Sequence, residues 1–308
     1  MNAKKILEFF RKNPALAGLL GMYVFLSIAS DRFFTLSNQV NILRQVSIQA
    51  IIAFGMTIVI ISGGIDLSVG SVFAFSAMVM ASILKSGNVL LGILTALLIG
   101  TAFGALNGVL VAKGKMQPFI ATLATMAIAR SFTLVYSQGM PITGFSRSFR
   151  FIGRGEVLGV PVPIVIMLGI LALSWYLMRM TKIGLYAYSI GGNEEATRLS
   201  GVKVDLYKVI FYTLSGLFTA VSAIILTARL NSAQPIFGIG YELDAIAAVV
   251  LGGASLSGGK GSVIGTFFGA LLMGVINNGL NLLNVSPFYQ QAVKGIVILL
   301  AVLLEKEE

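Results

Sequence analysis

Six long stretches of this chain carry no charged residue, and they restrict the folds that are open to it. They comprise residues 45–65, 67–84, 86–112, 157–178, 209–228 and 261–293. A helix needs ~20 mostly apolar residues to cross the ~30 Å hydrocarbon core of a membrane. Only 11% of the 308 residues are charged, against ~25% in soluble domains, so the chain could not cover a water-exposed surface. The sequence therefore predicts a polytopic membrane protein and excludes soluble-enzyme, collagen-like and disordered classes.

About ten transmembrane helices are expected, in an all-α membrane protein whose single domain spans residues 1–308. The predicted spans lie near 14–30, 46–62, 70–84, 89–112, 117–137, 160–179, 208–229, 243–252, 262–283 and 288–304. The eighth is too short to cross a membrane alone and is interpreted as a half-helix. The first follows four basic residues, as a signal peptide would, but no convincing cleavage site follows it. We interpret it as a retained helix.

The distribution of positive charge predicts the orientation of these spans. An even number of crossings places both termini on the same side of the membrane. The basic N-terminus, Lys113, Lys115 and the segment 179–208 then lie together in the cytoplasm, as the positive-inside rule requires. The net charge of +10 therefore indicates topology in a cell inner (cytoplasmic) membrane, and no nucleic-acid partner is expected.

Cysteine and histidine are both absent from the chain. Thiol nucleophiles, zinc sites and histidine acid–base catalysis are therefore excluded. The carboxylates are scattered, and no nucleophile or oriented base accompanies them. We expect no catalytic residue, no metal site and no cofactor bound by this chain.

Two internal echoes suggest a duplication. The segment 99–106 (IGTAFGAL) recurs as 264–271 (IGTFFGAL), five spans away, which would give the two halves opposite orientations as in inverted repeats. The segment 63–68 (GGIDLS) resembles 252–257 (GGASLS), which implies a parallel relation instead. The two alignments cannot both reflect one duplication, and glycine-rich apolar sequence also produces such matches by chance.

Glycines recur every four residues on two predicted helices, at Gly100, Gly104 and Gly108 and again at 261, 265 and 269. Small residues at this spacing let helix backbones approach closely in a membrane. Packing within one chain is the preferred interpretation, and a seam between two copies is the alternative.

Asp66 lies between two apolar runs, in the glycine-containing segment 62–71. A charge at mid-membrane costs ~2.5–3.5 kcal/mol, so this carboxylate should face protein or water and not lipid. Asp66 is a candidate for the transport pathway or its gate. The alternative, which we prefer, is that Asp66 caps the following helix with help from Ser68.

Glu242 and Asp244 precede a short predicted helix and would favour its positive end. They are further pathway candidates, and charge at a helix start on the outer membrane face is the preferred alternative. Amide side chains form a third candidate group, because they can bond the hydroxyls of a neutral solute or equally join helices. The amides are Asn107, Asn277, Asn278, Asn281 and Asn284, of which Asn107, Asn277 and Asn281 are the pathway candidates.

The segment 179–208 carries eight charges and contains a complete short helix within residues 191–201. Asn193 is the expected N-cap, Glu194 and Glu195 occupy the first turn, and Gly201 ends the helix. Glu194 and Arg198 form a favourable i,i+4 pair. A helix this short is marginal in water alone, so we expect it to dock on a cytoplasmic partner.

At this segment the sequence resembles the sugar permeases of bacterial ABC importers, and ribose-type permeases in particular. The blocks that carry the resemblance are 62–71, 118–125, 191–201, 240–253, 257–261 and 277–283, so it covers nearly the whole chain. It implies a permease pair, a homodimer in the simplest case, that moves a monosaccharide by alternating access. Two partner ATPase subunits would use ATP and Mg, and a separate extracytoplasmic sugar-binding protein would deliver the sugar. The chain has no P-loop of its own, and the segment 258–261 (GGKG) is interpreted as a tight turn.

The resemblance also implies which residues meet the partners. The ATPase would dock on Gly191, Gly192, Asn193, Glu194, Glu195, Ala196, Arg198, Leu199 and Gly201, and Glu195 and Arg198 are the residues to change in a test. Arg147, Arg150 and Arg154 would face outward, where they could meet acidic residues of the binding protein. An ATP-independent channel or secondary transporter, with Asp66 as an ion or proton site, is the alternative function.

Overall fold

The computed structural model describes residues 14–305. The basic N-terminal residues, on which the predicted orientation partly depends, lie outside this range. The helices are α2 (Pro14–Ala29), α3 (Leu36–Ile61), α4 (Val69–Lys85), α5 (Val89–Ala112), α6 (Pro118–Ser137), α7 (Arg147–Arg154), α8 (Val162–Met180), α9 (Lys182–Gly192), α10 (Glu194–Leu199), α11 (Val204–Leu230), α12 (Tyr241–Leu251), α13 (Val263–Leu282) and α14 (Pro287–Glu305). Two short antiparallel pairs join β1 (Ile142–Thr143) to β4 (Ser232–Ala233) and β2 (Glu156–Val157) to β3 (Val160–Pro161).

The all-α membrane class is confirmed. Six helices of the described chain are long and apolar enough to cross a membrane, namely α3, α5, α6, α8, α11 and α13. Every predicted span falls on a helix, although α3 begins at Leu36 and not near residue 46, because Thr35 caps it through the Asn38 amide. The sequence did not predict α7 or α9, the second of which lies inside the segment 179–208.

Helices α3 and α11 form the centre of the bundle, whereas α5, α6 and α8 present most of their apolar side chains outward. The glycine stripe of α5 explains how closely α11 approaches it. A Cβ on Gly100 would lie 2.3 Å from the Gly216 carbonyl oxygen, and one on Gly104 would lie 2.3 Å from that of Tyr212. The stripe therefore packs within one chain, as the preferred interpretation held.

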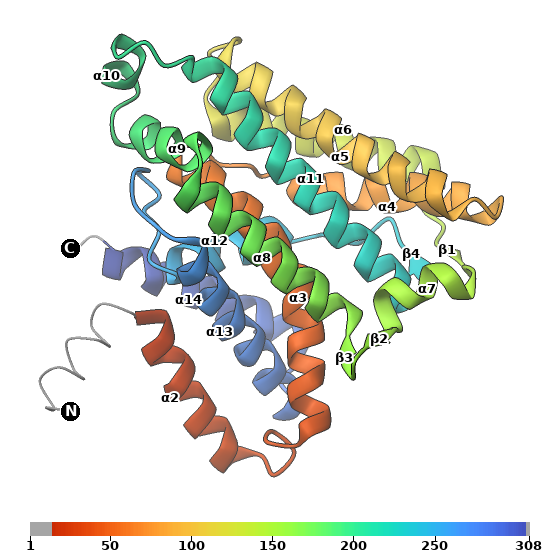
Figure 1. Ribbon diagram of the computed structural model, residues 1–308. Helices are drawn as coiled ribbons and strands as arrows, with labels where there is room; N and C mark the ends of the chain where they lie inside the picture. The colour runs from red at the N-terminus through yellow and green to blue at the C-terminus, as the bar shows by residue number, and fades with distance from the viewer. Residues whose placement is uncertain (1–13, 306–308) are drawn as a thin grey trace, which may run out of the picture.

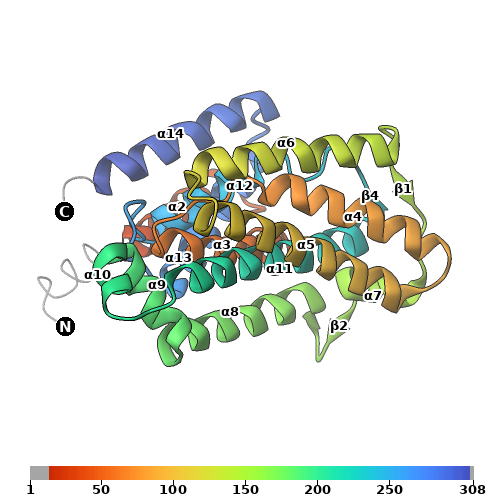
Figure 2. The ribbon, with the colours of Figure 1, turned by 90° about the horizontal axis from the view of Figure 1, so that it is seen from above.

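The two ends of the bundle differ (Figure 1). The start of α2, the end of α14, and α9 with α10 lie toward one end, and α7 with the β1–β4 pair lies toward the other. Figure 2, the view from above, has the same arrangement, with α14 along one edge of the bundle where it packs against α12. We refer to these ends as the α10 end and the α7 end.

Two stretches of non-helical chain interrupt the bundle and each leads into a helix. Residues 62–68 precede α4, and residues 234–240 precede α12. The two helix starts touch, because a Cβ on Gly70 would lie 2.0 Å from the Gly238 carbonyl oxygen. With 11 residues, α12 is ~16 Å long, as expected of a half-helix.

The order of elements bears on the two internal echoes. A long helix, a break, a short helix and a long helix follow one another in residues 36–112 and again in 204–282. The echo between 99–106 and 264–271 relates equivalent helices in this order, α5 and α13. The second echo relates non-equivalent loops, because 63–68 precedes α4 whereas 252–257 follows α12. The order therefore favours the inverted repeat.

Candidate functional site

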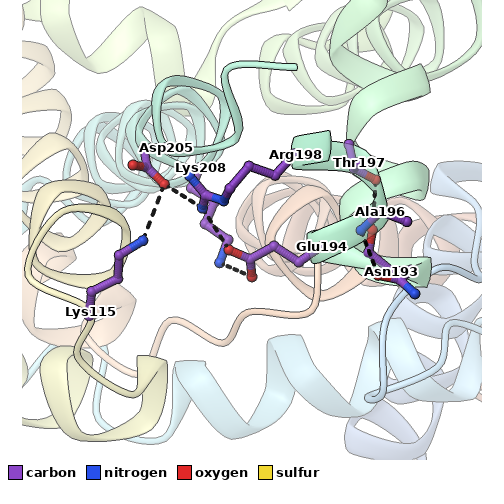
Figure 3. A network of polar contacts seen from close by, with 8 residues as sticks. All are labelled: Lys115, Asn193, Glu194, Ala196, Thr197, Arg198, Asp205 and Lys208. Atoms are coloured by element: carbon purple, nitrogen blue, oxygen red, sulfur yellow. Dashed lines mark hydrogen bonds and ion pairs between the residues drawn. The ribbon is translucent and has the colours of Figure 1, made fainter. Parts of the chain in front are cut away.

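The short helix α10 is held against α11 by a network of charges (Figure 3). The Asn193 side chain accepts from the Ala196 amide at 2.9 Å and caps the helix as predicted. Arg198 donates to Glu194 at 3.1 Å and to Asp205 at 2.7 Å. Two lysines from neighbouring elements extend the network, with Lys208 on Glu194 at 2.5 Å and Lys115 3.7 Å from Asp205. The network joins α10, the start of α11 and the turn after α5.

The charge state of Glu194 depends on this network. Partial burial alone would raise the pKa of the Glu194 carboxyl. Hydrogen bonds and charges from Lys208 and Arg198 outweigh burial, so the pKa of Glu194 lies below its usual value. The network is consequently fully charged at neutral pH.

The opposite face of α10 is exposed. Glu195 and Ala196 point to solvent, and Leu199 is 82% exposed. Gly192, Asn193 and Gly201 are exposed beside them, and Gly201 ends the helix with a φ of 83°. Arg198, which we expected to meet the ATPase together with Glu195, is 41% exposed and also forms ion pairs within the chain.

Just before α10, the end of α9 meets the end of α3 and the loop after α12 at glycines, and we term this contact the glycine junction (Ile61–Gly63, Gly191 and Gly258–Gly259). A Cβ on Gly191 would lie 1.9 Å from the Ile61 carbonyl oxygen. The Gly259 amide donates to that oxygen at 2.8 Å. The loop 258–261 has the predicted form of a tight turn, with positive φ at each of its three glycines. The junction connects α9 to the break before α4 and to the loop after α12.

Asp66 and Asn107 belong to one buried cluster in the break before α4. The Asp66 side chain accepts from the Ser68 amide at 3.0 Å and from the Ser215 hydroxyl at 3.2 Å. Asn107 donates to Ser68 Oγ at 2.8 Å and accepts from Thr125 at 2.6 Å. Because Asp66 is 1% exposed, its carboxylate holds the break to α5 and α11 and faces no open space.

Arg130 on α6 holds the break before α12 in place by hydrogen bonds to its backbone. It donates to the carbonyl oxygens of Pro235 at 2.7 Å and Phe237 at 3.0 Å, and to that of Gly70 at 3.3 Å. The sequence offered one signal for this role, since Arg130 is the sole charge in 116–146.

Glu242 and Asp244 lie in the first turn of α12, as the helix-start interpretation expected, and Asp244 is buried within the bundle. Residues 234–240 run against the start of α4 before α12 begins, so that Gly238 touches Gly70. Glu242 lies against the start of α4, close to where a Gly70 Cβ would be. Asp244 is 6% exposed and is held by Lys294 and Gln49, each at 2.9 Å.

The asparagines on α13 separate into different surroundings. Asn277 lines a cavity between the central helices. Asn278 exchanges two hydrogen bonds with Asn38 on α3, at 2.9 and 3.0 Å. Asn281 accepts from Gln290 on α14 at 2.9 Å. Of the three pathway amides, Asn277 therefore lines the cavity, Asn107 is buried, and Asn281 is exposed on the surface of α13.

The three arginines of α7 stand at the α7 end. Glu156, the acidic residue that follows them in the chain, pairs with Arg44 at 3.0 Å. Arg154 donates to the Arg229 carbonyl at 2.6 Å. No ion pair joins Arg147, Arg150 or Arg154 to a carboxylate of the described chain. Within residues 14–305, no three carboxylates gather closely enough to hold a metal ion.

Comparison with known proteins places these features in a family context. A family model described as "Branched-chain amino acid transport system / permease component" matches residues 38–302. The ribose import permease protein RbsC of Escherichia coli K12 is 52% identical over 302 residues, covering 96% of this chain and 94% of that protein. RbsC of Bacillus subtilis 168 is 52% identical over 94% of this chain and 91% of its own length. The L-arabinose transport system permease protein AraH of Escherichia coli K12 is 38% identical, over 94% and 90%. No solved structure matches.

Proposed function

The chain belongs to the permease family that includes the ribose import permeases, and from this we propose that it is the membrane-spanning subunit of an ATP-driven ribose importer. The observation that carries the proposal is α10. A six-residue helix is fixed to the bundle by ion pairs on one face and presents Leu199, 82% exposed, on the other. An apolar side chain held outward on a rigid helix is what a docking partner requires.

The partner on α10 is the ATPase subunit. Its contact surface comprises Glu195, Ala196 and Leu199, flanked by Gly192 and Gly201. The ATPase binds and hydrolyses ATP with Mg, and the permease holds no cofactor of its own. Movement of α10 passes through Gly191 of the glycine junction to the helices beyond it.

The membrane is crossed about ten times, and both termini and α10 lie on the cytoplasmic side of the inner membrane. Two of the crossings combine a break with a helix, 62–85 and 234–251. In a membrane, non-helical backbone is tolerated only where protein covers it or where it lines a water-filled cavity. The meeting of Gly70 with Gly238 covers part of both breaks.

A second copy of the chain covers the rest of these two breaks. The pathway for sugar lies between the two copies. Ile236 and Ile239 in the break before α12 are 63% and 65% exposed, although the backbone that carries them is non-helical. Lipid cannot satisfy such a backbone, which supports a protein neighbour on this face. Glu242 is the pathway candidate nearest to this face, and Asp66 and Asn107 anchor the break on the opposite side.

The extracytoplasmic binding protein delivers sugar to the α7 end. The unpaired charges of Arg147, Arg150 and Arg154 favour an acidic rim on that protein. Alternating access opens the pathway to the α7 end and to the α10 end in turn, and the ATPase drives this exchange through α10.

Reconstitution tests the proposal. The permease, its ATPase and its binding protein are placed in proteoliposomes, and ribose uptake is measured with and without ATP. We expect uptake only with ATP and loaded binding protein. Uptake driven by a proton gradient in ATP-depleted vesicles would instead establish a secondary transporter and refute the proposal.

A further inference from the structure

We propose that each permease copy has its own binding site for a neutral polyhydroxylated solute, in a half-open polar cavity lined by the central helices. This inference rests on the proposed function, since the solute is the transported sugar. The cavity has a volume of about 160 Å³ and lies between α3, α11, α12 and α13. Since a void of ~10–15 Å³ admits one water, this one has room for a solute.

The lining of the cavity is polar although the helices around it are the most buried in the bundle. It presents two glutamines, an arginine, a tyrosine and an asparagine: Gln45, Gln49, Arg229, Tyr241 and Asn277. Together these side chains offer amide and guanidinium donors, amide oxygens as acceptors, and a hydroxyl that does both. That is the set needed to bond sugar hydroxyls, each of which donates once and accepts twice.

One polar atom of this lining is buried and has no hydrogen-bond partner in residues 14–305, the Asn277 side-chain carbonyl oxygen. Gln45 and Tyr241 line the same cavity. Buried polar groups in native proteins are nearly always satisfied, so the Asn277 oxygen points to a polar occupant. Its neighbours in the lining are fixed, since Gln49 donates to Asp244 and Arg229 donates to the Arg44 carbonyl oxygen.

The position of the cavity fits delivery from the binding protein. Arg229 donates hydrogen bonds to the Asn41 side-chain oxygen and to the Arg44 carbonyl oxygen. The Arg44 side chain in turn forms an ion pair with Glu156 at the α7 end. Tyr241, the first residue of α12, follows the break that carries the exposed isoleucines. The cavity thus lies between the surface where sugar arrives and the break that we place at the pathway.

A cysteine-labelling assay tests the site directly, and the absence of native cysteine gives it no background. Asn277→Cys and the control Ser148→Cys, on exposed α7, are treated with a small methanethiosulfonate in the permease–ATPase complex without nucleotide. We expect ribose to slow labelling of Asn277→Cys by the factor 1 + [ribose]/Kd, roughly tenfold at ten times Kd, and to leave Ser148→Cys unchanged. Equal labelling of Asn277→Cys with and without ribose would overturn the site.

Transport provides the second measurement. Asn277→Leu removes the unpaired amide, and Asn277→Gln retains one. We expect Asn277→Leu to lower the ribose moved per ATP hydrolysed by roughly 2- to 12-fold, the effect of one neutral hydrogen bond, and Asn277→Gln to keep most of it. A wild-type ratio in Asn277→Leu also overturns the site. If the wild-type complex itself moves no ribose with ATP, the proposed function fails, whereas protection in the labelling assay would still establish the site.

Discussion

Replacing Gly191 by alanine adds one methyl group at the glycine junction and should separate ATP hydrolysis from sugar movement. The new Cβ would lie 1.9 Å from the Ile61 carbonyl oxygen and 2.5 Å from the Gly259 nitrogen. Both neighbours are backbone atoms, so neither can rotate away. The hydrogen bond from Gly259 to Ile61 must lengthen from 2.8 Å as the loops separate.

The size of the effect follows from these contacts. Overpacking by one methyl typically costs ~1–3 kcal/mol, and the strained hydrogen bond adds up to ~0.5–1.5 kcal/mol. A strain of ~2 kcal/mol that falls on one of two conformations shifts their ratio about 30-fold. Because the junction joins α9 to the break before α4 and to the loop after α12, the strain should act on the conformation in which these elements lie closest.

The assay compares Gly191→Ala with Gly192→Ala in the reconstituted importer. A Cβ on Gly192 meets no atom within 4 Å, so the second variant adds the same methyl group without the clash. We expect Gly191→Ala to bind the ATPase normally but to lose most of its ribose uptake per ATP hydrolysed. Equal transport by the two variants, or equal losses in both, would show that the junction does not carry the movement.

Three further predictions address the two ends of the bundle. Leu199→Asp should weaken co-purification of the ATPase by about 10-fold or more, as loss of a buried apolar anchor does, whereas Leu158→Asp, at a 99% exposed position far from α10, should not. Reversing Arg147, Arg150 and Arg154 to glutamate should lower binding-protein-stimulated ATPase activity, more strongly at low salt, and unchanged stimulation would remove α7 from the docking surface. The pKa of Glu194 is lowered when α10 is packed on α11. The ion pairs of α10 should therefore be complete above the usual glutamate pKa of ~4.3 and be lost as pH falls through the lowered pKa. Hydrogen-exchange protection of α10 should fall with them in the wild type, and Glu194→Gln should show a smaller transition, the part that Asp205 contributes through its bond to Arg198.

The sequence was sufficient where local rules decide the structure. The cap at Asn193, the pair of Glu194 with Arg198 and the stop at Gly201 all follow from spacing within one helix, and all three are confirmed. The long spans were equally accessible, because hydrocarbon thickness fixes the length of a transmembrane helix. The permease family also followed from the motifs, and the comparisons confirm it.

Contacts between distant segments were not accessible in this way. The approach of Gly70 to Gly238 joins residues far apart in the chain, and nothing in either segment alone indicates its partner. The burial of Asp244 and its bonds to Lys294 and Gln49 were not predicted for that reason. Similarly, α9 lacked a distinctive charge pattern, and the bond from Arg198 to Asp205 was not predicted because Asp205 lies across a turn.

The charges that interrupt the apolar runs become understandable once the two breaks are compared. Every backbone polar group within a membrane needs a partner, and a break removes the intrahelical ones. Before α4, Asp66 accepts from a backbone amide, and Tyr212 donates to the Ile65 carbonyl oxygen at 3.1 Å. Before α12, Arg130 donates to two carbonyl oxygens. The anion satisfies a donor and the cation satisfies acceptors, so each charge stabilises a particular non-helical backbone.

A charge within an apolar stretch is usually examined as a substrate or proton site, but the same charge is required wherever a crossing leaves the helical form. The two roles differ in what the side chain faces. Asp66 is buried and bonded to the Ser68 amide and the Ser215 hydroxyl, and Arg130 is bonded to backbone carbonyl oxygens, whereas Asn277 and Gln45 line a cavity. In this permease, therefore, Asp66 and Arg130 hold the broken crossings in place, and the neutral amides of Asn277 and Gln45 are among the groups that can meet a neutral sugar.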